Sequence, residues 1–184
     1  MVRKLLMRHA SLKEAIDLWS KPERIVLVTC VDQEGKPVVI TVSWQMRASF
    51  RPPMMAIAVH ENRYIHTCID SMKEFVLAVP GQDMAEAVLI CGSPGDSRQD
   101  RFEAAHLKTK SAEFLRSPLI ENCIANFECR VVNQLKTGDH TIFVGEVIAS
   151  WVNETVTKNL LAVDDDEGYI VLAEQGAYKI GIVK

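Results

Sequence analysis

The sequence has no excess of positive charge and no long apolar run. Lysine and arginine total 21 residues against 24 aspartates and glutamates, which gives a formal net charge of −3. This balance provides no global positive field for a nucleic acid or an anionic membrane, so neither is expected as a partner. Residues 1–9 contain basic side chains but no apolar stretch long enough for a signal peptide, and no later run approaches a membrane span. We therefore expect a cytoplasmic protein.

The cysteines and histidines lack the spacings of a disulfide framework or a metal site. The five cysteines are odd in number and include no Cys-x-x-Cys pair. The five histidines show no His-Glu-x-x-His spacing, so no metal is expected. Reduced, buried thiols are the favoured interpretation. Cys91 is the exception, because it precedes Gly92 in a segment that resembles a loop, and a reactive thiol is the alternative there.

Three common nucleotide-binding or hydrolytic motifs are also missing. No Gly-x-Gly-x-x-Gly follows the first predicted strand, and no Gly-x-x-x-x-Gly-Lys-Ser/Thr loop is present. Ser43 and Ser49 lack the Gly-x-Ser-x-Gly elbow of the α/β-hydrolases. A dinucleotide fold of the Rossmann type, a P-loop enzyme and a serine hydrolase are therefore disfavoured.

The composition is that of one folded domain over residues 1–184. Hydrophobic residues make up 48 % of the chain and charged residues 24 %, which is typical of globular proteins. Residues 1–20 form a helical lead-in, because residues 12–19 have apolar side chains at helical spacing behind Ser11, a candidate N-cap.

The remaining pattern is mainly β. Turn residues at 32–37 and 136–139 predict hairpins. Strands are expected over residues 25–31, 38–44, 54–60, 75–79, 123–135, 140–152, 169–172 and 178–183. Short helices are expected over residues 62–72, 83–90 with Asp83 as its cap, and 98–105. Strands paired in hairpins, rather than alternating with long helices, favour a closed antiparallel barrel of Greek-key type with helical insertions over a doubly wound parallel sheet.

Polar residues concentrate in residues 41–53 and 60–66. A strand end followed by a small-residue turn at Ala48-Ser49 exposes backbone donors and acceptors that a planar heterocycle could use. Asn62-Arg63 at a helix start adds free N–H groups, a positive dipole end and a guanidinium, which together suit a phosphate. Each residue taken alone also fits a turn, a core aromatic or a solvated charge, so the pattern by itself indicates an anion site and no more.

Several motifs resemble, in the same order, the flavin reductase-like family of FMN-binding split barrels, which includes the flavoredoxins. The resemblance spans roughly residues 20–183 and implies non-covalent FMN near the interface of a homodimer. The motifs are Thr41-Val-Ser-Trp44, Ala48-Ser49-Phe50-x-Pro52-Pro53, Asn62-Arg63-Tyr64-x-His66, Phe75-Val-Leu-Ala-Val-Pro80, Cys91-Gly92 with Gly95-Asp96, Asp100-Arg-Phe102, and Gly138-Asp-His140 through Val144-Gly-Glu-Val147.

The resemblance also implies roles for individual residues. One side of the isoalloxazine would be lined by Thr41, Ser43, Trp44 and Gln45. The polar edge of the ring and its N5 atom would face Ala48, Ser49 and Phe50. The phosphate and ribityl chain would be held by Asn62, Arg63, Tyr64 and His66.

His140 is the candidate catalytic residue, because the similar family residue lies close to the flavin and the nicotinamide. Its alternative is a histidine on a surface turn, and a hydride can pass directly between cofactors without a protein acid. Two features depart from the family pattern: Gln45-Met46-Arg47 replaces the commoner aromatic, small and proline residues, and Arg101 stands where many relatives have lysine. A long methionine and a cation beside the flavin would narrow the open face of the ring or alter its potential.

The resemblance implies an NAD(P)H-dependent FMN oxidoreductase that passes electrons to free flavin, ferric iron or a protein partner. The sequence does not distinguish NADH from NADPH. An electron carrier or flavin-storage protein without nicotinamide turnover is the alternative, and a barrel that has lost its flavin is a third possibility.

Overall fold

The computed structural model describes residues 7–94, 100–155, 158–164 and 168–184. Its largest element is an antiparallel sheet with the strand order β3-β2-β6-β9-β10-β5-β4. These strands are β2 (Val26–Val31), β3 (Pro37–Val42), β4 (Gln45–Phe50), β5 (Pro53–His60), β6 (Glu74–Val79), β9 (Ala125–Thr137) and β10 (His140–Val152). The predicted hairpin between β9 and β10 is confirmed, and Gly138 provides the positive φ of +58° at its turn.

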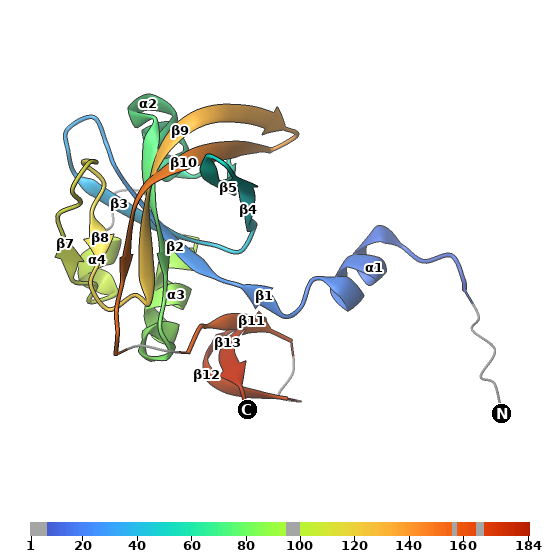
Figure 1. Ribbon diagram of the computed structural model, residues 1–184. Helices are drawn as coiled ribbons and strands as arrows, with labels where there is room; N and C mark the ends of the chain where they lie inside the picture. Colours follow the sequence, from blue (N-terminus) through green and yellow to red (C-terminus); the bar gives the residue numbers. More distant parts are fainter. Residues whose placement is uncertain (1–6, 95–99, 156–157, 165–167) are drawn as a thin grey trace.

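The sheet curls around a hydrophobic core. Buried side chains of β2, β3, β5, β6 and β10 meet in one cluster that includes Ile57, Phe75 and Phe143. Helix α2 (Tyr64–Met72) adds Ile65 and Ile69 to this cluster. Strands β3 and β4 are the two ends of the sheet and do not pair with each other. The antiparallel barrel expected from the sequence is therefore confirmed, but its strands do not close completely as the hairpin pattern predicted, because the sheet is open between β3 and β4 (Figure 1).

A second cluster lies against the outer face of the barrel wall. Leu27, Val39 and Ala78 point to this face and contact α3 (Ala85–Gly92), which follows the short helix η1 (Gln82–Met84). A smaller sheet in the order β1-β11-β13-β12 covers the same cluster. Its strands are β1 (Glu23–Arg24), β11 (Leu161–Val163), β12 (Tyr169–Gln175) and β13 (Tyr178–Val183), and a separate pair is formed by β7 (Thr109–Lys110) and β8 (Leu119–Ile120).

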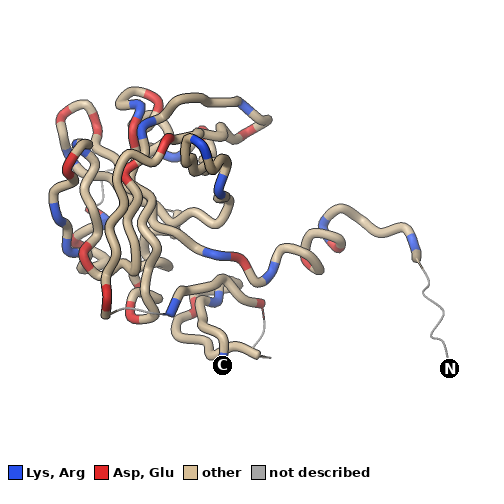
Figure 2. Tube along the Cα trace, viewed as in Figure 1, with Lys and Arg blue, Asp and Glu red and all other residues tan. Residues whose placement is uncertain are grey.

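The leading helix is confirmed as α1 (Leu12–Trp19), with the Ser11 hydroxyl accepting a hydrogen bond from the Glu14 N–H at 3.2 Å. The helix projects away from the barrel and has no buried residue (Figure 1). Along the described chain, no helix is long and apolar enough to cross a membrane. Lys and Arg positions are interspersed with Asp and Glu positions along the chain trace in Figure 2, which is consistent with the balanced charge of the sequence.

The segment at Ala48-Ser49 is a strand and not the turn that we predicted. β4 pairs with β5 along its length, and a β-bulge lies between Arg47 and Ser49. The small residues therefore mark an irregularity within a strand. The prediction failed because Gln45, Met46 and Arg47 are polar or exposed on an edge strand, where period-2 alternation is weak.

Three other local predictions differ from the structure. Asp83 does not cap α3, because it lies in η1 and the N-cap is Met84, which makes no side-chain cap hydrogen bond. The expected loop at Cys91-Gly92 is the last turn of α3. The predicted helix over residues 98–105 is observed as α4 (Arg101–Ala104), capped by Asp100, while residues 98 and 99 lie outside the described residues.

All five cysteines are free and buried, as the sequence predicts. Burial raises the pKa of the Cys91 thiol to about 12 and that of the Cys68 thiol to about 11. Cys91 is fully buried and lies in α3, so the alternative of a reactive thiol in a loop does not apply to it.

We expect these thiols to be unreactive in the native protein. The thiolate is the nucleophile, and burial disfavours both its formation and the access of a reagent. Ellman's reagent at mildly alkaline pH should release almost no colour within minutes from the native chain, and five equivalents after unfolding in guanidinium. Rapid modification of one native thiol would show that its segment opens readily.

Candidate functional site

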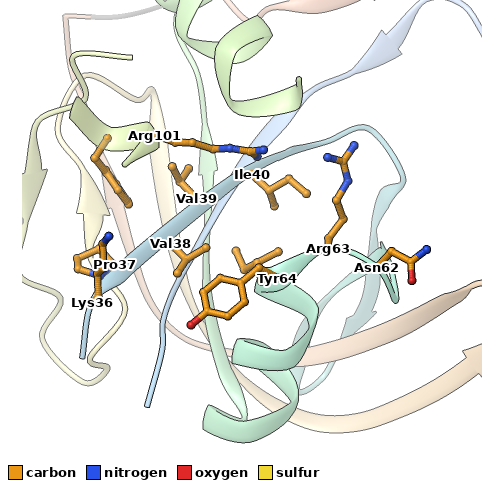
Figure 3. Close-up of a pocket in the computed structure, with 11 residues that line it drawn as sticks. Lys36, Pro37, Val38, Val39, Ile40, Asn62, Arg63, Tyr64 and Arg101 are labelled. Carbon is orange, nitrogen blue, oxygen red and sulfur yellow. The ribbon is translucent and has the colours of Figure 1, made fainter. Parts of the chain in front are cut away.

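Two neighbouring cavities follow the edge of β3 that faces away from β2. The smaller has a volume of about 110 Å³, and we call it the basic cavity. It lies between β3, the start of α2 and α4 (Figure 3). Its walls are formed by residues 36–40, residues 62–65, Arg101 and Phe102.

The larger cavity has a volume of about 360 Å³, and we call it the aromatic cavity. It lies between the ends of β3 and β5 and the hairpin residue Tyr178. Its walls are formed by residues 40–44, residues 58–60, Arg63, His140 and Tyr178. Ile40 and Arg63 line both cavities, so the two adjoin along one strand edge.

The basic cavity holds two arginines that have no carboxylate partner among the residues that the structure describes. Figure 3 shows the guanidinium groups of Arg63 and Arg101 approaching each other beside Ile40. Arg101 donates hydrogen bonds to the carbonyl oxygens of Cys91 at 2.7 Å and Ser93 at 2.9 Å, whereas Arg63 makes no hydrogen bond or ion pair within the described residues. Burial lowers the pKa of Arg101, and the nearby charge of Arg63 lowers it further. An anion placed between them would relieve this repulsion.

The start of α2 contributes further donors to the basic cavity. Arg63 is the N-cap of this nine-residue helix and makes no side-chain cap hydrogen bond, so no side chain satisfies the first N–H groups of α2. Tyr64, which also lines the cavity, donates its hydroxyl to Asp32 Oδ2 at 3.2 Å. The same aspartate accepts the N–H groups of Glu34 at 3.0 Å and Lys36 at 2.8 Å, and thereby fixes the turn that leads into β3.

Two histidines and an aspartate meet at the aromatic cavity. The His140 ring lies 4.7 Å from the Trp44 ring and 5.0 Å from the His60 ring, measured between centroids. Asp139 Oδ1 lies 2.7 Å from His140 Nδ1, and Asp139 Oδ2 lies 3.6 Å from His60 Nε2. The hydrogen bond with His140 holds the pKa of Asp139 below its usual range.

These contacts assign the proton on each imidazole. His60 Nδ1 accepts the Asn62 N–H at 3.0 Å, so a neutral His60 carries its proton on Nε2, facing Asp139. His140 Nδ1 faces the carboxylate and therefore carries the proton, which leaves Nε2 of a neutral His140 as an acceptor. The His140 side chain is 20 % exposed, so it is not the solvated turn histidine that was its alternative.

Together the two cavities fit a flat heterocycle that carries a phosphate. β3 is an edge strand, so the backbone N–H and C=O groups on its unpaired side face the cavities instead of another strand. Aromatic rings stand at one end of this edge and two cations at the other. Within the described residues, no cluster of three or more histidine, cysteine, aspartate or glutamate side chains could hold a metal ion.

Comparison with known proteins agrees with this arrangement. The model of the flavin reductase-like domain family matches residues 20–170, which include both walls formed by β3 and α2. The chain belongs to the flavin reductase-like family. Members of this family bind flavin, and the resemblance stated from the sequence is thereby confirmed.

Individual relatives in the flavin reductase-like family are moderately similar. An uncharacterised protein of Archaeoglobus fulgidus is 37 % identical over 113 residues, or 61 % of this chain and 64 % of its own length. The reductase component of a 4-nitrophenol monooxygenase from Rhodococcus opacus is 26 % identical over 123 residues, or 67 % of this chain and 63 % of its own length. The matched part of the chain thus spans just under two thirds of these relatives.

The fold is shared with solved structures of the flavin reductase-like family. A Shewanella frigidimarina protein described as a flavin reductase with a split-barrel domain superposes with a TM-score of 0.72. The match is 16 % identical and covers 89 % of this chain and 81 % of the other. The barrel with its opening between β3 and β4 is therefore a split barrel.

Seven of the predicted site residues line the two cavities. They are Thr41, Ser43, Trp44 and His140 in the aromatic cavity, Asn62 and Tyr64 in the basic cavity, and Arg63 in both. The hydroxyl of Thr41 already donates to the Val88 carbonyl oxygen at 2.6 Å, so this side chain holds α3 against β3. Trp44, with 58 % of its surface exposed, has an open ring face.

The other predicted residues lie away from both cavities in this chain. They are Gln45, Ala48, Ser49, Phe50 and His66. Phe50 is 81 % exposed at the end of β4. His66 Nε2 instead lies 2.8 Å from the Thr141 hydroxyl, which is a contact between α2 and β10. Met46 and Arg47 also lie on β4 outside the cavity walls, so they do not narrow either cavity within one chain.

The sequence did not single out three residues that line the cavities. Arg101 was noted within the Asp100-Arg-Phe102 motif and as a departure from the family lysine, but not as a site residue. His60 was noted only as part of a polar segment, and Tyr178 only as the start of a strand. The polar segment that contains Asn62 and Arg63 was the one available signal for His60. Tyr178 gave no signal, because a tyrosine at a strand start is ordinary β-sheet composition.

Proposed function

We propose that this protein binds FMN non-covalently and acts as an NAD(P)H-dependent oxidoreductase of the flavin or ferric reductase type. The observation that carries the proposal is the continuous strand edge with aromatic rings at one end and, at the other, two arginines that have no carboxylate partner among the described residues. The 26 % identity to the reductase component of a monooxygenase supports the same activity. Free oxidised flavin, ferric iron or an acceptor protein would take the electrons.

Each part of the site has a separate task in this proposal. Arg63, Arg101 and the start of α2 would hold the phosphate, which accounts for two cations that no carboxylate of the described segments contacts. The free edge of β3 would hydrogen-bond the polar edge of the ring. When bound, FMN supplies the hydride and single-electron chemistry, and the residues supply orientation and a water-poor surface.

His140 acts in this proposal through its unprotonated Nε2. Asp139 holds the Nδ1 proton and so fixes both the tautomer and the ring orientation. The ring lies against Trp44 at a tilt of 34°, and Nε2 is then available to position a nicotinamide amide or a flavin edge group. The role is positioning, because hydride transfer between two cofactors needs no protein acid.

Replacing His140 with glutamine should therefore slow flavin reduction without releasing the flavin. We expect the rate of FMN bleaching by the preferred nicotinamide to fall about tenfold, since an oriented contact is lost while the phosphate site remains. Stopped-flow absorbance under anaerobic conditions measures the rate, and His9→Gln is the matched control on an exposed histidine. A rate unchanged by His140→Gln would remove His140 from the mechanism.

We also propose that the chain works as a homodimer. Met46 and Phe50 are 59 % and 81 % exposed on the edge strand β4, and an edge strand with apolar side chains is suited to contact a second copy. Residues 48–50 would then reach a flavin only across that interface. Light scattering on the purified chain tests this, and a monomer at every concentration would contradict it.

The visible spectrum followed by anaerobic mixing with NADH and with NADPH tests the activity. Flavin absorbance that bleaches with one nicotinamide supports the reductase. Flavin that stays oxidised with both supports the electron carrier or storage protein instead. A colourless protein that neither binds added FMN nor quenches its fluorescence would contradict both and leave a scaffold.

A further inference from the structure

The aromatic cavity has one wall from outside the region that matches the family model. Tyr178 lies at the start of β13, and the match to the flavin reductase-like family ends at residue 170. The hairpin of β12 and β13 thus brings a ring to the proposed flavin site from a part of the chain that the family match does not include. Its role is not explained by the barrel, whose core is complete without it.

The hairpin holds Tyr178 in place through its buried face. Ile180 and Ile182 are 4 % and 6 % exposed and share a face of β13 with Tyr178, because alternate residues of a strand point the same way. Both isoleucines pack in the cluster beneath α3. Tyr178 lies on the same face two residues before Ile180, outside the cluster, and lines the aromatic cavity.

The tip of the hairpin is also tied to the phosphate end of the site. Ser93 Oγ lies 2.9 Å from Gln175 Oε1 and 2.8 Å from the Leu89 carbonyl oxygen, which share its single proton, and Arg101 donates to the Ser93 carbonyl oxygen at 2.9 Å. Ser93 therefore fixes the hairpin relative to the arginine of the basic cavity. A ring on this hairpin has a defined position with respect to a ligand whose phosphate lies between Arg63 and Arg101.

Tyr178 itself has no partner within the described residues. The residue is 70 % exposed and makes no hydrogen bond or ring contact there, whereas the Trp44 and His140 rings contact each other at a tilt. A flat aromatic ring held over a cavity by a fixed strand, with an unoccupied face, is suited to stack on a planar ligand.

On the basis of the proposed function, we propose that Tyr178 stacks on the flavin ring and shields it from solvent. Aromatic side chains would then contact the flavin from two parts of the chain, the end of β3 and the hairpin of β12 and β13. The ring and not the hydroxyl makes this contact, because the contact depends on the aromatic surface. Tyr178 is a positioning and shielding residue in this proposal and takes no part in proton or hydride transfer.

Titration of wild type and Tyr178→Ala with FMN tests the inference. We expect the Kd for FMN to rise about three- to tenfold, the equivalent of one aromatic stacking contact. Bound FMN should also become several-fold brighter in fluorescence, since a tyrosine ring in contact with the ring system quenches it, and more accessible to iodide. Tyr178→Phe should keep the Kd within about twofold, because it keeps the ring.

Two controls make the outcome decisive. Phe114→Ala removes an exposed aromatic ring that lines neither cavity, and it should leave FMN binding unchanged. Tyr178→Leu keeps an apolar side chain without the aromatic ring, and it replaces the alanine variant should that variant melt early. If Tyr178→Ala and Tyr178→Leu both bind FMN with the Kd, the flavin fluorescence and the iodide accessibility of the wild type, the shielding role is overturned and the proposed function is not. A wild type that binds no FMN would overturn the proposed function with it.

Discussion

Removing both Arg63 and Arg101 is expected to weaken FMN binding on the order of a thousandfold. A hydrogen bond to a charged group contributes about 1.5–3 kcal/mol, so each single alanine variant should weaken binding about 10- to 150-fold. The thousandfold figure is the sum of two mid-range single effects, and a departure from it measures the coupling between two cations that share one phosphate. Isothermal titration with FMN measures all three variants.

Riboflavin distinguishes a phosphate contact from a general loss of structure. It has the same ring and no phosphate, so its weaker binding should be nearly the same in wild type and in the Arg63→Ala/Arg101→Ala variant. Arg130→Ala, an exposed arginine on β9 away from both cavities, should bind FMN normally. Equal losses for FMN and riboflavin would mean that the phosphate lies elsewhere.

One half of this cation pair could be predicted from the sequence and the other half could not. Arg63 follows a strand and begins a helix, so a local pattern indicates a guanidinium beside free N–H groups. Arg101 reaches the same cavity from α4, a helix of four residues that the tertiary fold places beside β3. No periodicity in the sequence brings these two segments together.

The error at residues 48–50 has a physical cause. An edge strand with a bulge has little period-2 alternation, because one side faces solvent and the bulge shifts the remaining residues to the other face. Ala48 and Ser49 therefore had the composition of a turn. The longer strands β9 and β10 were predicted closely because each is a long run of β-forming residues beside the strong turn signal at residues 136–139.

Gly145 shows what a family motif can mean when the packing is known. A Cβ atom added there would lie 2.7 Å from Cys129 Cβ and 2.9 Å from the Phe75 ring, so β10 can approach its neighbours only without a side chain at this position. Its place in the resembling motif was visible in the sequence. The reason for the glycine needed the neighbours from β6 and β9.

Replacing Glu128 with alanine is expected to lower the free energy of unfolding by about 3 kcal/mol, since buried donors left without an acceptor cost about 1–3 kcal/mol each. Glu128 is fully buried on β9. Its carboxylate accepts the Glu113 N–H at 3.0 Å, the Phe114 N–H at 2.9 Å and the Trp151 Nε1–H at 2.9 Å. Alanine removes the acceptor of all three, and water can reach only those at the edge of the loop.

Glu128→Gln should lower the free energy of unfolding by less than Glu128→Ala does. This difference would show that the loss of hydrogen-bond acceptors destabilises the protein. The amide oxygen can still accept from two of the three groups, but the amide nitrogen then faces an N–H donor, so one hydrogen bond is lost and one repulsive contact is gained. Glu113→Ala is the matched control, because Glu113 contributes its backbone N–H and an exposed side chain. Urea unfolding measures all three variants. One buried unsatisfied donor costs at least about 1 kcal/mol. If the free energy of unfolding of Glu128→Ala differs from that of wild type by less than this, water must satisfy the donors of the loop.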